Sequence, residues 1–188
     1  MMKHFKNDVV AAVLMLPKNR YWNEYQKTIA DDHYFYERSC IRQTFFPGSE
    51  TAFLRILREE LGKDIFDDFR QHTCTGIGYH ADIVPFETTM TVCARLFSLM
   101  TEHGYKNYVP SCVTSFGVFT EVLHTWQEHP ELLENTRENL YKATGREFEI
   151  PENLVHPSDI IYKFREELAG KMKYRLVNSF TGKPLVQV

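Results

Sequence analysis

The stretch KNYVPSCVTSFGVFTEVLHTWQ, residues 106–127, contains the local pattern that decides the fold. Residues 106–110 are predicted to form a short strand, and residues 116–127 carry apolar side chains at helical spacing. Cys112 lies in the turn between them, and Ser115 follows it at the spacing of a Cys-x-x-Cys motif. The stretch therefore predicts a strand-to-helix turn that carries a thiol.

The same order of strand and helix is expected along most of the chain. Aromatic and β-branched residues favour strands, and capped segments with apolar positions at helical spacing favour helices. The expected elements, in order, are a strand at 33–40, a helix at 49–61, a loop at 72–80, a helix at 87–103, the strand and helix above, a helix at 130–145, a strand at 153–156 and a helix at 157–169. Alternation of this kind predicts an α/β fold with a small, mainly parallel sheet flanked by helices.

Composition places the chain among ordinary globular proteins. It has 188 residues, of which 43% are hydrophobic and 25% charged. The net charge of −3 gives no reason to expect a nucleic-acid partner. The longest apolar run, residues 9–16, is too short to cross a bilayer, and no cleavage pattern follows it. We therefore expect no transmembrane segment and a cytoplasmic location with reduced cysteines.

The chain is expected to divide into three regions. Residues 1–32 are an N-terminal arm, whose apolar run at 9–16 is predicted to be a buried strand. Residues 33–170 form the α/β domain, and residues 171–188 are a short tail of mixed composition.

Three of the four cysteines share one position in this pattern. Cys40, Cys74 and Cys112 each follow an extended segment and precede a helix, so they should meet beyond the carboxyl ends of the strands, where open α/β sheets bind ligands. Cys93 lies instead on the apolar stripe of a helix and is expected in the core. The spacing fits no zinc-finger pattern, and by itself it also suits three inert thiols.

The sequence around these cysteines resembles a known family. The segments are SCIRQTFFPGSE (39–50), HTCTGIGYHADIVPFETTMTV (72–92) and GYKNYVPSCVTSFGVFTE (104–121). Together they resemble the cysteine-rich CCG domain found in the B subunit of heterodisulfide reductase and in its relatives, over roughly residues 34–180. The family motif is one Cys, then Cys-Cys, then Cys-x-x-Cys.

The resemblance implies a redox subunit with an iron–sulfur cluster, a noncubane [4Fe–4S] centre in the best-known members. Cys40, Cys74 and Cys112 match three of the five ligands, and Thr73 and Ser115 stand where the family has cysteines. Hydroxyl groups ligate iron poorly, so binding is expected to be weak or absent. The alternatives are a cluster completed by His72 or His80, a zinc or dithiol site on the same cysteines, and an interaction module without a cluster.

The resemblance also implies partners. They are other subunits of a heterodisulfide-reductase-like complex or a second CCG module, because the related subunits carry the module twice. The tail at 171–188 leads toward such a second module and stops before its motif. The chain is accordingly expected to be the amino-terminal half of a longer subunit or a protomer that pairs with another CCG chain.

Overall fold

The computed structural model describes residues 28–71 and 73–171. The elements of these residues, in chain order, are β1 (Tyr34–Glu37), α3 (Cys40–Phe45), α4 (Pro47–Arg55), the π-helical turn η2 (Ile56–Glu60), β2 (Ile65–Phe66), the 3₁₀ turn η3 (Phe69–Gln71), α5 (Gly76–His80), α6 (Phe86–Glu102), β3 (Asn107–Pro110), α7 (Val113–Glu128), α8 (Pro130–Thr144), β4 (Asn153–Leu154), α9 (Pro157–Lys163) and α10 (Arg165–Lys171).

The strands form one parallel sheet in the order β2-β1-β3-β4. β1 and β3 make the central pair, in which Tyr34 lies opposite Asn107 and Glu37 opposite Pro110. Every residue of both central strands is buried, as expected for a parallel sheet with helices on both faces. The predicted α/β fold with a small parallel sheet is confirmed.

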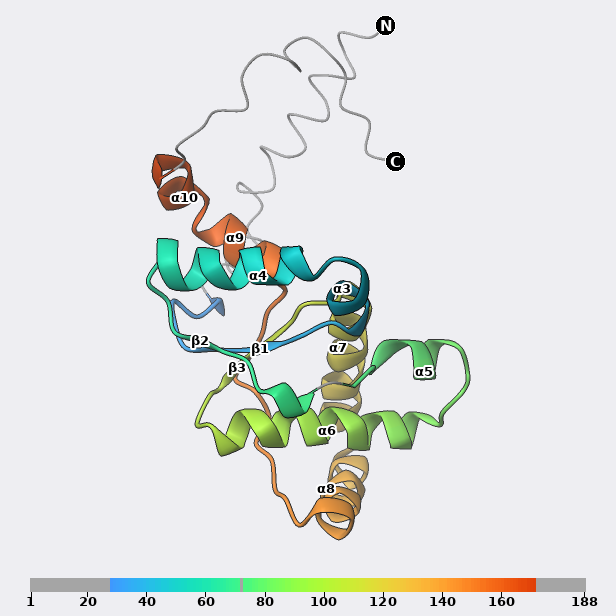
Figure 1. Cartoon of the computed structure of the whole chain (residues 1–188). Coiled ribbons are helices and arrows are strands. Elements are labelled where there is room, and N and C mark those ends of the chain that lie inside the picture. The colour runs from blue at the N-terminus through green and yellow to red at the C-terminus, as the bar shows by residue number, and fades with distance from the viewer. Residues whose placement is uncertain (1–27, 72, 172–188) are drawn as a thin grey trace, which may run out of the picture.

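Alternate side chains of the central strands point into two separate cores, one on each face of the sheet. Phe35 and Tyr108 pack into a large core with residues of α6, α7 and α8. Tyr34, Tyr36 and Val109 pack into a smaller core with residues of α4, η2 and α9. Figure 1 shows the corresponding layers, with α4 and α9 on one side of the strands and α6 and α8 on the other.

Local signals set several helix ends. Pro47, Pro130 and Pro157 each occupy the first turn of a helix. Proline suits this position because the N–H that it lacks would have no partner within the helix. Gly145 ends α8 in the left-handed region, with φ of 69°, which a residue without Cβ adopts without strain.

The structure differs from the sequence expectations at four places. Residues 40–45 form a helix that was not expected, and the next helix starts at Pro47 rather than at Ser49. The segment 76–80, expected as loop, forms the short helix α5. The two-residue strand β2 was not expected, and the helix expected at 157–169 is interrupted at Phe164.

Most of the predicted arm, residues 1–27 with the apolar run at 9–16, lies outside the described residues, as does the tail from residue 172. Within the described residues, no helix combines the length and apolarity needed to cross a membrane.

Candidate functional site

The candidate site lies at the carboxyl end of the parallel sheet. Cys40 begins α3 directly after β1, and Cys112 is the N-cap of α7 directly after β3. Cys74 follows β2 and η3 and precedes α5. In Figure 1, α3, α5 and the start of α7 lie together at one end of the sheet. Parallel strands end at a common edge, so these three turns are brought to one side of the molecule.

Cys40, Cys74 and Cys112, hereafter the thiol site, are electrostatic neighbours. Cys40 and Cys74 are exposed residues, and Cys112 is half-buried. Partial burial raises the pKa of Cys40, and the charge and hydrogen-bonding contact of Cys74 raise it further, with a smaller effect from Cys112. Cys74 and Cys112 thus both lie near enough to Cys40 to act on its pKa.

The pKa of Cys112 is shifted in the opposite direction from that of Cys40. Burial alone would raise its pKa, but the N–H groups of Ser115 and Thr114 and their hydroxyls favour the thiolate, so the pKa is lowered overall. The sulfur makes no standard capping bond at the start of α7, so these donors act as a polar environment at the helix N-terminus. These surroundings favour the thiolate of Cys112, whereas those of Cys40 disfavour its thiolate.

The donor set does not fit a cluster with five thiolate ligands. Ser115 is buried, and its Oγ accepts a hydrogen bond of 2.8 Å from Thr75 Oγ1. That oxygen is a neutral hydroxyl already engaged in the protein. Within the described residues, no group of three His, Cys, Asp or Glu side chains is arranged to hold a metal ion.

A buried acid that the sequence analysis did not single out lies behind the thiols. Glu37, the last residue of β1, is only 2% exposed, and its Oε2 has no hydrogen-bond partner. Burial raises the pKa of Glu37 well above its ordinary value, and the negative charges of Cys112 and Cys74 raise it further. Nothing in the strand YFYE distinguishes a buried acid from one at a solvated strand end.

We expect the variant Glu37→Gln to be more stable than the native protein at neutral pH. The folded state holds the Glu37 proton more tightly than the unfolded state, so native stability falls as pH rises above about 4.3, the unfolded value. Glutamine keeps the shape without this cost, which is about 1.4 kcal/mol for each unit of pKa difference. Chemical unfolding of both proteins from acidic to neutral pH measures the difference. A difference that does not grow with pH would contradict this account.

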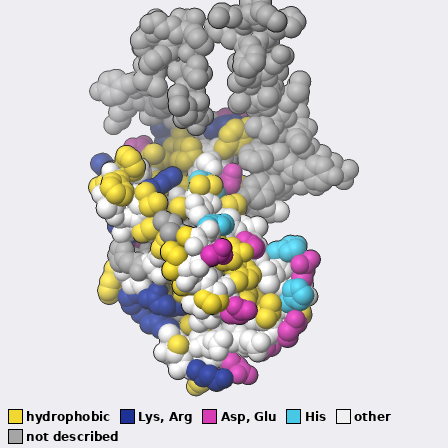
Figure 2. Space-filling model, turned by 90° about the vertical axis from the view of Figure 1, so that its right-hand side faces the viewer, with side chains coloured by type: hydrophobic (Ala, Val, Ile, Leu, Met, Phe, Trp, Pro, Cys, Tyr) yellow, Lys and Arg dark blue, Asp and Glu magenta, His cyan; other side chains and the backbone are white. Residues whose placement is uncertain are grey.

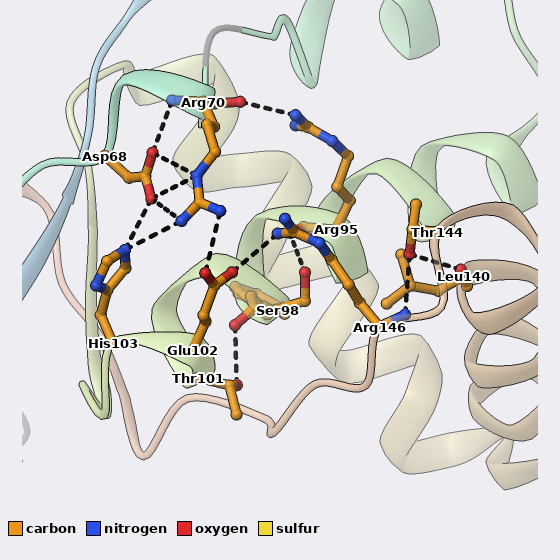
Figure 3. Close-up of polar contacts among 11 residues, drawn as sticks. Asp68, Arg70, Arg95, Ser98, Thr101, Glu102, His103, Leu140, Thr144 and Arg146 are labelled. Atoms are coloured by element: carbon orange, nitrogen blue, oxygen red, sulfur yellow. Dashed lines mark hydrogen bonds and ion pairs between the residues drawn. The ribbon is translucent and has the colours of Figure 1, made fainter.

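The segment that leads to Cys74 is anchored by a buried ion pair. Asp68, 4% exposed, accepts a 3.0 Å hydrogen bond from Arg70 Nε, and its Oδ2 lies 2.8 Å from His103 Nε2. Figure 3 shows Asp68 between these two side chains, with Glu102 and Arg146 extending the network. The arrangement joins η3 to the end of α6, and it holds the pKa of Asp68 well below its usual range, chiefly through the hydrogen bonds from Arg70.

The turn after Cys74 packs closely against the first turn of α7, where Gly76 lies next to Thr114. A Cβ added at Gly76 would lie 2.5 Å from Thr114 Cγ2 and 3.2 Å from Thr114 Cβ. Only glycine lets the first turn of α5 approach the first turn of α7 this closely. The Thr75–Ser115 hydrogen bond lies beside this contact in sequence and joins the same two segments.

The variant Gly76→Ala is expected to lower the free energy of unfolding by about 1–3 kcal/mol, because the methyl group overpacks this contact. The double variant Gly76→Ala with Thr114→Ser should recover most of the loss, since serine lacks the methyl group in the way and keeps the hydroxyl. Urea unfolding of the three proteins provides the measurement. A single variant as stable as the native protein would show that the two turns separate freely.

The remaining candidates have different outcomes. Cys93 is fully buried in the larger core, as predicted. His80 is exposed at the end of α5, and His72 lies outside the described residues. Glu50 lies in the first turn of α4, where acids usually stabilise the helix dipole, but it is buried and bonded to other segments.

Apolar side chains are exposed around the thiol site. Six of the eight large hydrophobic residues exposed in the described part of the chain lie on segments that follow β1, β2 or β3, namely Ile41, Phe45, Phe46, Phe69, Ile83 and Val113. Figure 2 looks from the side on which α3 and α5 lie in Figure 1, and hydrophobic side chains are visible on that face. Ile41 and Val113 directly follow Cys40 and Cys112 in sequence, whereas Phe69 lies with Phe66 and His103.

Comparison with known proteins gives one informative sequence relative. The chain is 26% identical over 148 residues to the B subunit of the ferredoxin:CoB-CoM heterodisulfide reductase of Methanosarcina acetivorans. The match covers 78% of this chain and 46% of that protein, so the chain spans about half the length of its relative. This similarity supports a related family. No family model matches the chain.

Among solved structures, the fold is similar to the crystal structure of a hypothetical protein from Helicobacter pylori. The TM-score is 0.54 at 13% sequence identity, over 79% of this chain and 32% of that one. A likeness at this identity concerns the fold alone.

Proposed function

We propose that the chain is a module of a redox complex related to heterodisulfide reductase, and that Cys40, Cys74 and Cys112 carry out disulfide and thiol chemistry in it. The observation that supports the proposal is the placement of the three thiols on turns that follow the parallel strands, with Cys74 and Cys112 both acting on the pKa of Cys40. The relative named for heterodisulfide reduction supports the substrate class, a disulfide between two small thiols.

The thiols themselves suffice for one round of this chemistry. The Cys112 thiolate, favoured by the N–H groups at the start of α7, attacks a disulfide RSSR and releases RS⁻. Cys74 then attacks the mixed disulfide at Cys112 and releases the second RS⁻. The substrate gains two electrons, the two cysteines lose them in forming one disulfide, and their two protons leave with the two RSH products. Reduction by an external dithiol or an electron-carrying partner restores the site.

Cys74 is assigned the resolving role because it is exposed and because it and Cys112 act on the same buried acid, Glu37. It is also the strongest charged neighbour of Cys40. The variant Cys74→Ser tests the assignment. After reaction with a small disulfide, it should retain a mixed disulfide on Cys112, visible as an added mass on that peptide. Absence of any adduct on Cys112 would reject the proposed order of attack.

A cluster-bearing form of the proposal assigns the same three cysteines as thiolate ligands of an iron–sulfur cluster, which would supply electrons one at a time. Three thiolates leave such a cluster incompletely ligated, because Thr73 and Ser115 offer only hydroxyls. No step of the chemistry above passes through it. Zinc on the same thiols and a module without chemistry are the other readings. Anaerobic purification with iron, sulfide and zinc analysis separates them.

The double variant Thr73→Cys with Ser115→Cys is expected to bind more iron and sulfide than the native protein after anaerobic reconstitution. The substitutions restore the two thiolates that the family motif contains, and soft thiolates are the ligands iron–sulfur clusters prefer. Iron and sulfide per chain, measured beside the native protein treated identically, give the result. No gain in a folded double variant would count against mapping these positions onto the motif.

The exposed apolar side chains around the thiols are where we propose that the module meets other parts of the complex. Exposed apolar side chains that gather on one part of a surface can mark an interaction site. The length of the relative, of which this chain matches 46%, is consistent with further segments or chains at this edge. The domain boundaries at residues 33 and 170 remain part of this proposal.

A further inference from the structure

Glu50 occupies an unusual position for an acid in the first turn of a helix. It is 2% exposed, whereas such residues commonly point into solvent. Its Oε1 accepts a hydrogen bond of 2.7 Å from the backbone N–H of Ser39 and another of 3.0 Å from Ser111 Oγ. One oxygen atom on α4 therefore joins two segments that are distant in sequence.

The two segments are the ones that present thiols. Ser39 precedes Cys40 and caps α3, where its Oγ accepts a hydrogen bond from the N–H of Arg42. Ser111 precedes Cys112, is fully buried, and donates its own N–H to the carbonyl of Glu37. The side chain of Glu50 thus reaches the residue immediately before each cysteine.

We propose that Glu50 is the positioning residue of the thiol site, and that its carboxylate sets the separation of Cys40 and Cys112 by binding both turns at once. The inference rests on the proposed function in that Cys40 and Cys112 are taken to belong to one thiol site. It adds a residue that does not react and acts through Ser39 and Ser111.

The contacts explain why a carboxylate suits this position. A charged acceptor makes stronger hydrogen bonds than a neutral one, and the buried setting removes competition from water. An acid that only complemented the helix dipole would need neither burial nor partners outside its helix. Glu87 is such an acid, since it lies exposed in the first turn of α6. It provides a matched control.

The test measures the distance between the two thiols by chemical bridging. In the background variant Cys74→Ser, Cys40 and Cys112 are the accessible thiols, because Cys93 is fully buried. The folded protein is treated with bis-methanethiosulfonate reagents of increasing spacer length, and the yield of intramolecular bridge is measured by mass spectrometry. If Glu50 fixes the separation of the two turns, one spacer length should bridge Cys40 and Cys112 in much higher yield than the others.

Three substitutions separate shape from charge. Glu50→Gln keeps an oxygen that accepts both hydrogen bonds, so it should retain the preferred spacer. Glu50→Asp keeps the charge but shortens the side chain by one methylene, and Glu50→Ala removes the acceptor. Both should lower the bridge yield at the preferred spacer severalfold or more, because a misplacement of reacting groups by about 1 Å can cost about 10²-fold in rate. Glu87→Ala should leave it unchanged.

The outcomes distinguish this inference from the proposed function. A native spacer preference in Glu50→Asp and Glu50→Ala would overturn the role of Glu50 and leave the thiol site intact. Failure of every spacer to bridge the background protein would contradict the meeting of the thiols, and with it the proposed function. If the Glu50 variants do not fold, the variant Ser111→Ala tests the role of Glu50. It removes one of the two hydrogen bonds to Glu50 and should broaden the range of spacer lengths that bridge Cys40 and Cys112.

Discussion

Iodoacetamide is expected to label Cys112 at least about 10³-fold faster than Cys93 in the folded protein. Cys93 is fully buried in the larger core, and burial raises its pKa well above the ordinary value. It can react only when the domain opens. With a free energy of unfolding of about 5 kcal/mol or more, fewer than about one molecule in 10³ is open at any time. Cys112 is half-buried, and its pKa is lowered by the donors at the start of α7, so it reacts from the native state.

Peptide mapping after a timed pulse of the reagent gives both rates in one sample. Labelling in concentrated urea is the control, since all four thiols should then react at similar rates. Comparable rates at Cys93 and Cys112 in native buffer would show that Cys93 is accessible, contrary to its position in the larger core.

Replacement of Asp68 by alanine is expected to lower the free energy of unfolding by about 3 kcal/mol. The side chain is almost fully buried and serves both Arg70 and His103, so its loss leaves two donors without their acceptor. The segment that leads to Cys74 should also become looser, because η3 loses its connection to α6. Urea unfolding measures the stability, and the labelling rate of Cys74 reports the local effect.

Glu102→Ala is the matched control for this prediction. Glu102 pairs with the same arginine, Arg70, at 3.0 Å, but its side chain is 46% exposed. Exposed ion pairs contribute little, so a loss below about 1 kcal/mol is expected. Equal losses in the two variants would mean that the burial of Asp68 is not what gives the pair its strength.

Sequence patterns were sufficient for the larger elements and for placing Cys40, Cys74 and Cys112 on the turns between strands and helices. The aromatic strand at Tyr34–Glu37 and the strand at Asn107–Pro110 carry strong β signals and lie at the sheet centre. Because parallel strands deliver their following turns to one edge, Cys40 and Cys112 could be placed together without any knowledge of contacts. Cys93 could be placed in the core from helical periodicity alone.

The features that the patterns missed depend on contacts between distant segments. β2 has two residues, too few for a periodic signal, and α5 contains two glycines that weaken any local preference for helix. The role of Asp68 depends on His103, and that of Glu50 on Ser111, which only the folded chain brings near. The burial of Glu37 likewise follows from the helices that cover the sheet.

The most direct test of the thiol site is to map the disulfides formed when the reduced protein reacts with one equivalent of oxidised glutathione. The account predicts one intramolecular disulfide that includes Cys74, release of two equivalents of glutathione, and Cys93 still reduced. Mass spectrometry of peptides under non-reducing conditions, with the protein kept dilute, gives the pairing. Thiols that remain reduced, or disulfides found only between molecules, would contradict the claim that Cys40, Cys74 and Cys112 form one working site.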